Sequence, residues 1–361
     1  MGIRGLASWI AWSAGTTIEE PQWETWRGKR LGVDILCLLY NSKSRKQCPF
    51  LYLGKLIVAA KQCGITLFPI FDGKPPQEKL ETIKQRGKVR DQSNSKRLIL
   101  EYDISHTIMS ESQKEVVHAE IRKLEKKGLY FSSEEREMAK QIFYACGVVS
   151  LNATGEADNV LSYFTKRGEF DGVISNDYDL LARGVETLLV PEQYALPGDP
   201  SGWKQYTLSK ILQTVQVQYD QFLEICVLMG SDYTTGKKTL PYKLAFWAIK
   251  YGGSFERALE NLHIKESDRP LYYKAKEILR GSEENRESLM GEKQWEKWAQ
   301  GDICPEINNI QELRRSYFQG LTDQEYAMLT TTNLNATNLN ATNLNTIHLN
   351  AKFTQHVELS S

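Results

Sequence analysis

The chain has 361 residues, of which 41% are hydrophobic and 25% are charged, values typical of one large enzyme domain with or without appendages. It contains no apolar run long enough to cross a membrane and no signal-peptide pattern between Met1 and Trp12, so we expect neither membrane insertion nor secretion. Its formal net charge is zero, which by itself argues against a strongly basic nucleic-acid-binding protein.

Apolar runs bounded by turn-forming residues indicate buried strands in the first part of the chain. These runs are residues 30–36, 65–71, 147–151, 171–176 and 186–191. Helical patterns separate most of them, for example at 51–62 and 156–167. This alternation predicts an α/β fold with a mainly parallel sheet that is flanked by helices on both faces.

Residues 76–135 interrupt the alternation, because they are highly charged and contain no convincing buried strand. Helical periodicity is clearest at 111–127, so we interpret the segment as an insertion of mobile helices over one edge of the sheet. Between Lys74 and Arg97 there are eight Lys or Arg residues and three acids, a local charge of +5. A solvated helix face is the ordinary explanation for such a run.

The last part of the chain has two different patterns. From about residue 217 to 330 it is helical throughout, and residues 333–351 then repeat a unit close to NLNAT. Low-complexity disorder explains these few copies better than a stacked β-helix. We therefore divide the chain into a core at 1–232 (with its insertion at about 76–135), a helical region at 233–330 and an Asn-rich tail at 331–361.

Acidic side chains stand at the ends of three predicted strands. Asp34 lies at the end of the first apolar run, Asp72 directly follows the second, and Asp177 and Asp179 follow the fourth. An Asp after a strand is most often only a turn residue or a helix cap. Because ligands of a parallel α/β sheet bind at the carboxyl ends of its strands, these acids are expected at one edge.

Three more acids complete this set. Glu156 and Asp158 lie where a helix should begin, and Asp232 follows an apolar helical run. Two bare carboxylates about 4 Å apart repel by roughly 4 kcal/mol at an effective dielectric constant of 20, so converging acids need cations. Oxygen ligands without paired His or Cys favour magnesium or manganese over zinc. Two such ions can activate water and stabilise the leaving oxygen of a phosphodiester.

The ordered motifs resemble the flap endonuclease (XPG-like) family of structure-specific 5′ nucleases from Met1 to about Lys250. The matching segments are MGIRGL, VDILCLLY, FDGKPPQEK, GEAD, SNDYDLLARG and LMGSDY. The resemblance implies a PIN-like or resolvase-like sheet, a helical arch formed by the charged insertion, and a magnesium-dependent DNA endonuclease. It also implies that two metal ions, for which manganese can substitute, are held by seven acids: Asp34, Asp72, Glu156, Asp158, Asp177, Asp179 and Asp232.

The resemblance assigns roles to several residues outside the acidic set. Lys79 and Arg86 would lie at the base of the arch and stabilise the charge that develops on the scissile phosphate, where losing one donor commonly costs ~10²–10³ in rate. Tyr40 would stack on a base near the cut site. Without the resemblance, the two cations would be interpreted as solvated surface residues, and Tyr40 would fit a core aromatic about as well as a DNA contact. Further DNA contacts are expected from Lys74, Lys237, Lys238 and Lys243.

The sequence departs from the family pattern in three places. Only 31 residues separate Tyr40 from Asp72, where a hydrophobic wedge should open the junction, so we expect junction recognition to differ. In the hairpin after the last acid, Thr239 and Pro241 replace expected glycines, which makes potassium binding doubtful. The segment 311–318 (QELRRSYF) approaches a sliding-clamp motif, but it has Arg at the apolar position and is better explained as an amphipathic helix.

We therefore predict a monomeric endonuclease that cuts branched DNA at a 5′ flap or gap junction during replication, repair or recombination. A 5′–3′ exonuclease or a junction resolvase on the same scaffold is a close alternative. A nuclease acting on RNA is another, because no residue reports on the 2′-hydroxyl. A non-catalytic junction-binding protein should lack at least one metal acid, and none is lost here. We expect an intracellular protein, nuclear or at cytoplasmic sites of DNA replication.

Overall fold

The computed structural model describes residues 2–192, 202–234 and 236–281, with isolated positions at 289, 322, 324, 325 and 327. The predicted Asn-rich tail, the segment 311–318 and nearly all of 282–330 therefore lie outside the described residues. Within the described part of the chain, no helix is both long enough and apolar enough to span a membrane.

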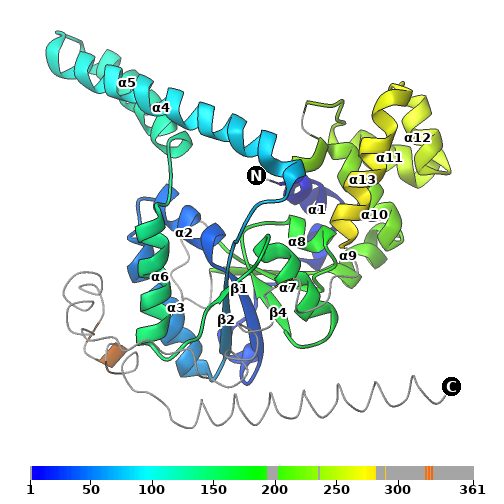
Figure 1. The fold of residues 1–361 in the computed structure, drawn as a ribbon, viewed down its shortest axis with the longest axis horizontal. Coiled ribbons are helices and arrows are strands. Elements are labelled where there is room, and N and C mark those ends of the chain that lie inside the picture. Colours follow the sequence, from blue (N-terminus) through cyan, green and yellow to red (C-terminus); the bar gives the residue numbers. More distant parts are fainter. Residues whose placement is uncertain are drawn as a thin grey trace.

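The centre of the molecule is a six-stranded sheet in the order β3-β2-β1-β4-β5-β6, seen behind the helices in Figure 1. Neighbouring strands are parallel except for β5 and β6, which are antiparallel. The strands are β1 (Arg30–Asp34), β2 (Thr66–Phe71), β3 (Leu151–Asn152), β4 (Gly172–Ile174), β5 (Thr187–Pro191) and β6 (Trp203–Thr207). The predicted α/β fold with a mainly parallel sheet is confirmed.

Two strands differ from the sequence-based prediction. The strand expected at 147–151 is reduced to Leu151–Asn152, because the preceding residues close a helix instead. Gly147 has a φ of 71°, and the amide of Val148 donates back to the carbonyl of Phe143. The edge strand β6 was not predicted, because its five residues WKQYT bury only the first and fourth side chains and so lack the two-residue alternation of a half-buried strand.

Helices cover both faces of the sheet. One face carries α1 (Leu6–Ala14), α7 (Ala157–Lys166), α8 (Asp179–Ala182), α9 (Leu208–Val215) and α10 (Tyr219–Met229). The other carries α2 (Ile35–Ser44), α3 (Pro49–Cys63) and α6 (Ser133–Ala145). Gly32 in β1 allows close packing on the first face, since a Cβ there would lie 2.6 Å from Leu161 Cδ2 and 2.7 Å from Phe170 Cδ2.

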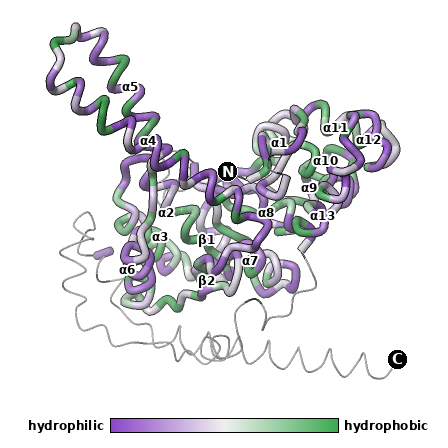
Figure 2. The backbone as a smooth tube through the Cα atoms, turned by 45° about the horizontal axis from the view of Figure 1, so that its top comes forward, coloured by the Kyte–Doolittle hydropathy of each residue, from purple (hydrophilic) through white to green (hydrophobic). Residues whose placement is uncertain are grey.

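The charged insertion forms two long helices, α4 (Leu80–His106) and α5 (Glu111–Lys127). They lie side by side and project away from the body of the molecule (Figure 1). Figure 2 shows that they are largely hydrophilic, which explains the patchy periodicity of their sequence. Ser110 begins α5 with a capping box, in which its hydroxyl accepts from the amide of Gln113. The predicted helical arch insertion is confirmed.

The region after β6 is helical as far as Arg280, as predicted. After α9 and α10 it contains the helices α11 (Tyr242–Gly252), α12 (Phe255–Asn261) and α13 (Arg269–Arg280). A short 3-10 turn, η4 (Asp232–Thr234), follows α10. This turn brings Asp232 to the base of the arch, where the hydroxyl of Thr82 in α4 donates to the Asp232 carbonyl over 3.1 Å.

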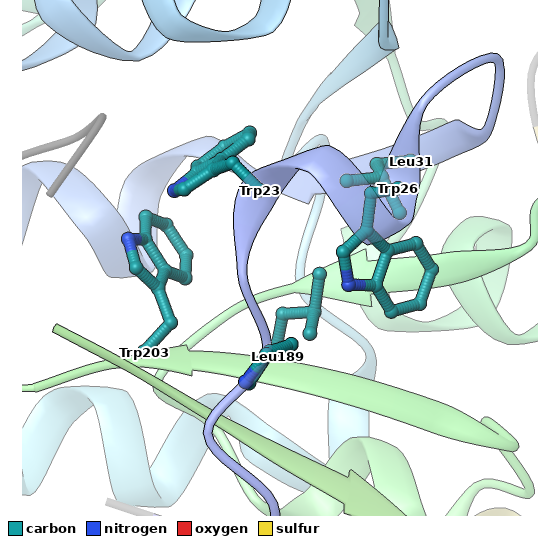
Figure 3. Close-up of a pocket in the computed structure, with 6 residues that line it drawn as sticks. Trp23, Trp26, Leu31, Leu189 and Trp203 are labelled. Carbon is teal, nitrogen blue, oxygen red and sulfur yellow. The ribbon is translucent and has the colours of Figure 1, made fainter. Parts of the chain in front are cut away.

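Three tryptophans surround a small apolar pocket near the antiparallel edge of the sheet (Figure 3). The rings of Trp23 and Trp203 meet edge to face with centroids 5.0 Å apart, and Trp26, Leu31, Leu189 and Pro21 complete the wall. This pocket contains none of the seven predicted metal acids, and its apolar lining fits a packing role.

Candidate metal centre at the carboxyl edge of the sheet

Three strands deliver acids to one edge of the sheet, as the sequence predicted. Asp34 is the last residue of β1 and caps α2, where its side chain accepts from the amide of Cys37 over 3.2 Å. Asp72 follows β2 and accepts from the amide of Ala157, the first residue of α7, over 2.7 Å. This bond places the Asp72 carboxylate at a helix N-terminus, where negative charge is stabilised.

A chain of hydrogen bonds connects the acids that follow β4 to Asp34. Ser175 donates its hydroxyl to Asp34 Oδ2 over 2.7 Å and accepts from the amide of Asp177 over 2.9 Å. The amide of Asp179 donates to Asp177 Oδ1 over 3.0 Å. The N-terminal segment completes the chain, because the amide of Ile3 donates to Asp179 Oδ1 over 2.6 Å.

The N-terminal segment therefore belongs to the site, which the sequence reasoning missed. Gly2 has a φ of 88°, and a Cβ on it would lie 2.4 Å from Asp179 Oδ1. Only glycine allows the backbone to come so close to this carboxylate. In the motif MGIRGL, the second residue is therefore required by packing against the acid.

Glu156 and Asp158 lie where α7 begins. Glu156 is the N-cap residue and Asp158 is in the first turn, so the expectation that a helix begins there is confirmed. Burial is the largest cause that raises the pKa of Asp158, and the carboxylates of Asp177 and Asp34 raise it further. These interactions place acids from three elements within electrostatic reach of one another.

Burial raises the pKa of three more acids in this set, Asp34, Asp72 and Asp179. Burial, followed by the negative charge of Asp72, raises the pKa of Asp34 to about 7. Burial and the neighbouring Asp177 raise the pKa of Asp179 well above its usual value. The site thus holds more negative charge than its own surroundings balance, which is the condition that a bound cation relieves.

Two cations of the arch lie at its base, beside the acids. Lys79 Nζ forms an ion pair with Glu156 and lies 3.7 Å from Asp232 Oδ2. Arg86 Nη2 lies 2.6 Å from Asp232 Oδ1. Burial alone would lower the pKa of Lys79, but Glu156 and Asp158 raise it above its usual value, so this side chain stays charged. The predicted position of both residues at the base of the arch agrees with the structure, and their catalytic role stays a prediction.

A third cation, which the sequence reasoning missed, lies inside the acidic set. The side chain of Arg183 is only 3% exposed, and its Nη2 lies 3.0 Å from Glu156 Oε2. Its Nε lies 3.6 Å from Asp158 Oδ2, and Nη2 also donates to the hydroxyl of Tyr233 over 2.6 Å. A signal was present in the sequence, because Arg183 stands four residues after Asp179 in a short apolar segment where an unpaired Arg cannot be buried.

The donor set of this site fits hard divalent cations, since every predicted ligand is a carboxylate and four of them have raised pKa values. In the residues that the structure describes, however, no three acidic, His or Cys side chains are grouped as ligands of one metal ion. Glu156 and Asp232 instead form ion pairs with Lys79, Arg86 and Arg183. The assignment of metal ligands therefore stays a prediction.

The remaining predicted DNA contacts lie around this site. Tyr40 in α2 is half-buried, its ring meets Phe131 edge to face with centroids 5.3 Å apart, and its hydroxyl accepts from the Phe131 amide. This contact is the core-aromatic arrangement considered as the alternative. Lys74 is exposed beside Asp72, and its amide donates to the carbonyl of Thr154 over 3.0 Å.

The three predicted DNA-contacting lysines after Asp232 have internal partners; two precede α11, and Lys243 lies in its first turn. Lys237 Nζ lies 2.8 Å from Asp268 Oδ1, Lys238 donates to the carbonyl of Leu262, and Lys243 Nζ lies 5.3 Å from the centre of the Trp12 ring. Lys238 and Lys243 are exposed, so both remain accessible to a phosphate. Their role in DNA binding stays a prediction.

The amino-acid sequence of this chain is similar to two family models and to several known proteins. Family models described as the XPG N-terminal domain and the XPG I-region match residues 1–93 and 147–232. The chain is 25% identical to flap endonuclease 1 of Danio rerio, covering 75% of this chain and 71% of the relative, and 24% identical to that of Bos taurus, covering 90% of each.

Solved structures show the same fold. The flap endonuclease-1 from Methanococcus jannaschii superposes with a TM-score of 0.55 at 20% identity, covering 87% of this chain and 95% of that one. The catalytic core of Rad2 in complex with DNA substrate gives a TM-score of 0.59 at 15% identity, covering 91% and 99%. Both matches extend over most of the chain, beyond the two segments that the family models match.

Proposed function

Because the chain belongs to the XPG family of flap endonucleases, we propose that it is a magnesium-dependent nuclease that hydrolyses DNA phosphodiester bonds at 5′ flap or gap junctions. The products would be a 5′-phosphate and a 3′-hydroxyl. The observation that carries the proposal is the position of the acids: buried carboxylates at one edge of the sheet interact with each other directly beside the two cations of the arch base.

The acids would hold the two metal ions from different elements. Asp34, Asp72, Asp177 and Asp179 would act from the strand ends, with Glu156 and Asp158 from the start of α7 and Asp232 from η4. When bound, two hard divalent ions supply activation of water and stabilisation of the leaving oxygen. The hydrogen bonds through Ser175 and the Ile3 amide would keep the carboxylates oriented.

Lys79 and Arg86 would change partners when DNA binds. In the structure they neutralise Glu156 and Asp232, and the pKa of Lys79 is raised. A phosphate at the edge of the sheet presents the same kind of anionic oxygen to both side chains. They would then stabilise the charge that develops on the scissile phosphate, which is the effect expected of fixed cations in a transition state.

The arch would guide single-stranded DNA to the acids. Its basic start, with a local charge of +5 between Lys74 and Arg97, attracts the phosphate backbone independently of sequence. Since a nuclease with this substrate acts where DNA is replicated, repaired or recombined, we propose that the protein works at those sites as a monomer.

A 5′–3′ exonuclease on the same scaffold is the second candidate, and one observation favours it. Helices α2 and α3 are joined only by residues 45–48, in the stretch where a junction-opening wedge is expected. Without such a wedge, the protein would depend less on the upstream duplex. Cleavage at gaps, nicks and free 5′ ends should then approach cleavage at flaps.

The test compares the parent with Asp179→Asn and with a matched control, Asp220→Asn, whose side chain is exposed and pairs with Arg280. End-labelled 5′-flap, gapped, blunt-ended and four-way-junction DNA, and an RNA flap, are incubated with EDTA, magnesium or manganese. We expect the parent and the control to cut near the flap base only with metal, while Asp179→Asn binds but does not cut. A folded parent that binds flap DNA and never cuts would instead be a non-catalytic junction-binding protein.

A further inference from the structure

Arg183 pairs with the acids from the core of the protein, whereas Lys79 and Arg86 belong to the start of the arch. Its guanidinium contacts Glu156 and Asp158, the two acids at the start of α7. The Arg183 side chain is 3% exposed, against 20% for Lys79 and 36% for Arg86. A cation at this depth must be balanced by buried negative charge.

The surrounding structure fixes Arg183 in place. Its amide donates to the carbonyl of Asp179 over 2.9 Å, and its carbonyl accepts from the hydroxyl of Ser162 over 2.6 Å. Nη1 donates to Asn159 Oδ1, one residue after Asp158. The backbone of Arg183 is thus held by α8 and α7, and its guanidinium is held by α7. The guanidinium therefore cannot turn toward solvent without disturbing these helices.

Glu156 is therefore bound from two sides. Lys79 reaches Oε1 from the arch, while Arg183 and the hydroxyl of Tyr233 reach Oε2 from the core. Burial alone would raise the pKa of Glu156, but Lys79 and then Arg183 lower it, so the group is a carboxylate. Phosphate binding would compete for Lys79, whereas Arg183 is out of its reach.

We propose that Arg183 is a positioning residue, a fixed internal counter-ion that holds Glu156 and Asp158 at the start of α7 whether or not divalent cations are bound. The inference rests on the proposed function, because it concerns two of the acids that would bind metal. Arg183 also supplies positive charge that a divalent cation would otherwise provide. The stability of the fold therefore depends less on that cation.

Removing the charge of Arg183 should make the stability of the fold depend more strongly on a bound divalent cation. In EDTA, Arg183→Gln leaves Glu156 and Asp158 close together without their internal partner, which lowers the melting temperature. Magnesium or calcium can then replace the missing charge. A residue that only packs would lower the melting temperature equally with and without the cation.

The experiment measures the melting temperatures of the parent, Arg183→Gln and Arg183→Lys in EDTA, in magnesium chloride and in calcium chloride, without DNA. Arg167→Gln is the matched control, because Arg167 follows α7, is half exposed and forms an ion pair with Glu169, which is not one of the predicted metal ligands. We expect the cation-induced rise in melting temperature to be at least twofold larger for Arg183→Gln than for the parent. Arg167→Gln should match the parent.

Equal rises in parent and Arg183→Gln would overturn the role of Arg183 and leave the proposed function standing. A parent whose melting temperature does not respond to either cation would count against the proposed metal site, and the inference would fail with it. If Arg183→Gln folds in neither solution, Arg183→Lys decides. It keeps the charge, so it should fold in EDTA with a cation-induced rise equal to that of the parent, and an Arg183→Lys that also folds in neither solution overturns the inference.

Discussion

Replacing Asp34 with Asn should make the metal-free protein more stable at pH 8. The carboxylate of Asp34 is buried at the end of β1, and burial together with the nearby Asp72 raises its pKa from 3.8 to about 7. In the native state, therefore, the group holds a proton up to about pH 7, whereas in the unfolded state it loses the proton near pH 4. Between these values the native state binds more protons, so its stability falls as the pH rises.

The size of the effect follows from the same shift. The rise of this pKa from 3.8 to about 7 corresponds to about 4 kcal/mol of unfavourable free energy once the carboxylate is ionised. An Asn side chain can still accept from the Cys37 amide as the cap of α2, and it carries no charge at any of these pH values. Because the bond from Ser175 already lowers this pKa, its contribution is contained in the same value of about 4 kcal/mol. We expect Asp34→Asn to be more stable than the parent by about 4 kcal/mol at pH 8 in EDTA, with little difference at pH 4.

Urea denaturation of the parent and Asp34→Asn in EDTA at pH 4, 5, 6, 7 and 8 measures this difference directly. Because Asp158 and Asp179 have raised pKa values in both proteins, only the difference between the two curves is diagnostic. Magnesium at pH 8 should reverse the order, since only the parent keeps the full set of carboxylates. A difference between the two proteins that does not change with pH, or a less stable variant at pH 8, would refute this reasoning.

Three further predictions concern catalysis, binding and packing. Lys79→Ala or Arg86→Ala should lower the single-turnover cleavage rate by ~10²–10³, with flap affinity changed far less; equal losses in both would assign them to binding. Tyr40→Ala should weaken binding of flap DNA by about 1–3 kcal/mol if the ring stacks on a base, whereas Tyr40→Phe should bind like the parent; unchanged binding of Tyr40→Ala would leave only its packing role. Gly73→Ala should lower the melting temperature by several degrees, because a Cβ there would lie 2.0 Å from the carbonyl oxygen of Ala153; an unchanged melting temperature would contradict that contact.

The strand–helix alternation of the core could be predicted because each central strand is a short apolar run buried on both faces. β1 and β2 were found within one or two residues of their ends for this reason. The edge strands β3 and β6 were predicted poorly, since an edge strand is defined by its pairing with a neighbour. β3 pairs through only two residues, Leu151 and Asn152, with the end of β2.

The sequence by itself determined that acids would follow the strands of a parallel sheet, and therefore that they would gather at one edge. Chain direction alone fixes which end of a parallel strand carries the residue after it. Only the tertiary structure decided which charges balance those acids. Arg183 is buried between Glu156 and Asp158, and the Ile3 amide reaches Asp179 across 176 residues, because such contacts depend on how α7, α8 and the N-terminal segment pack and not on any local pattern.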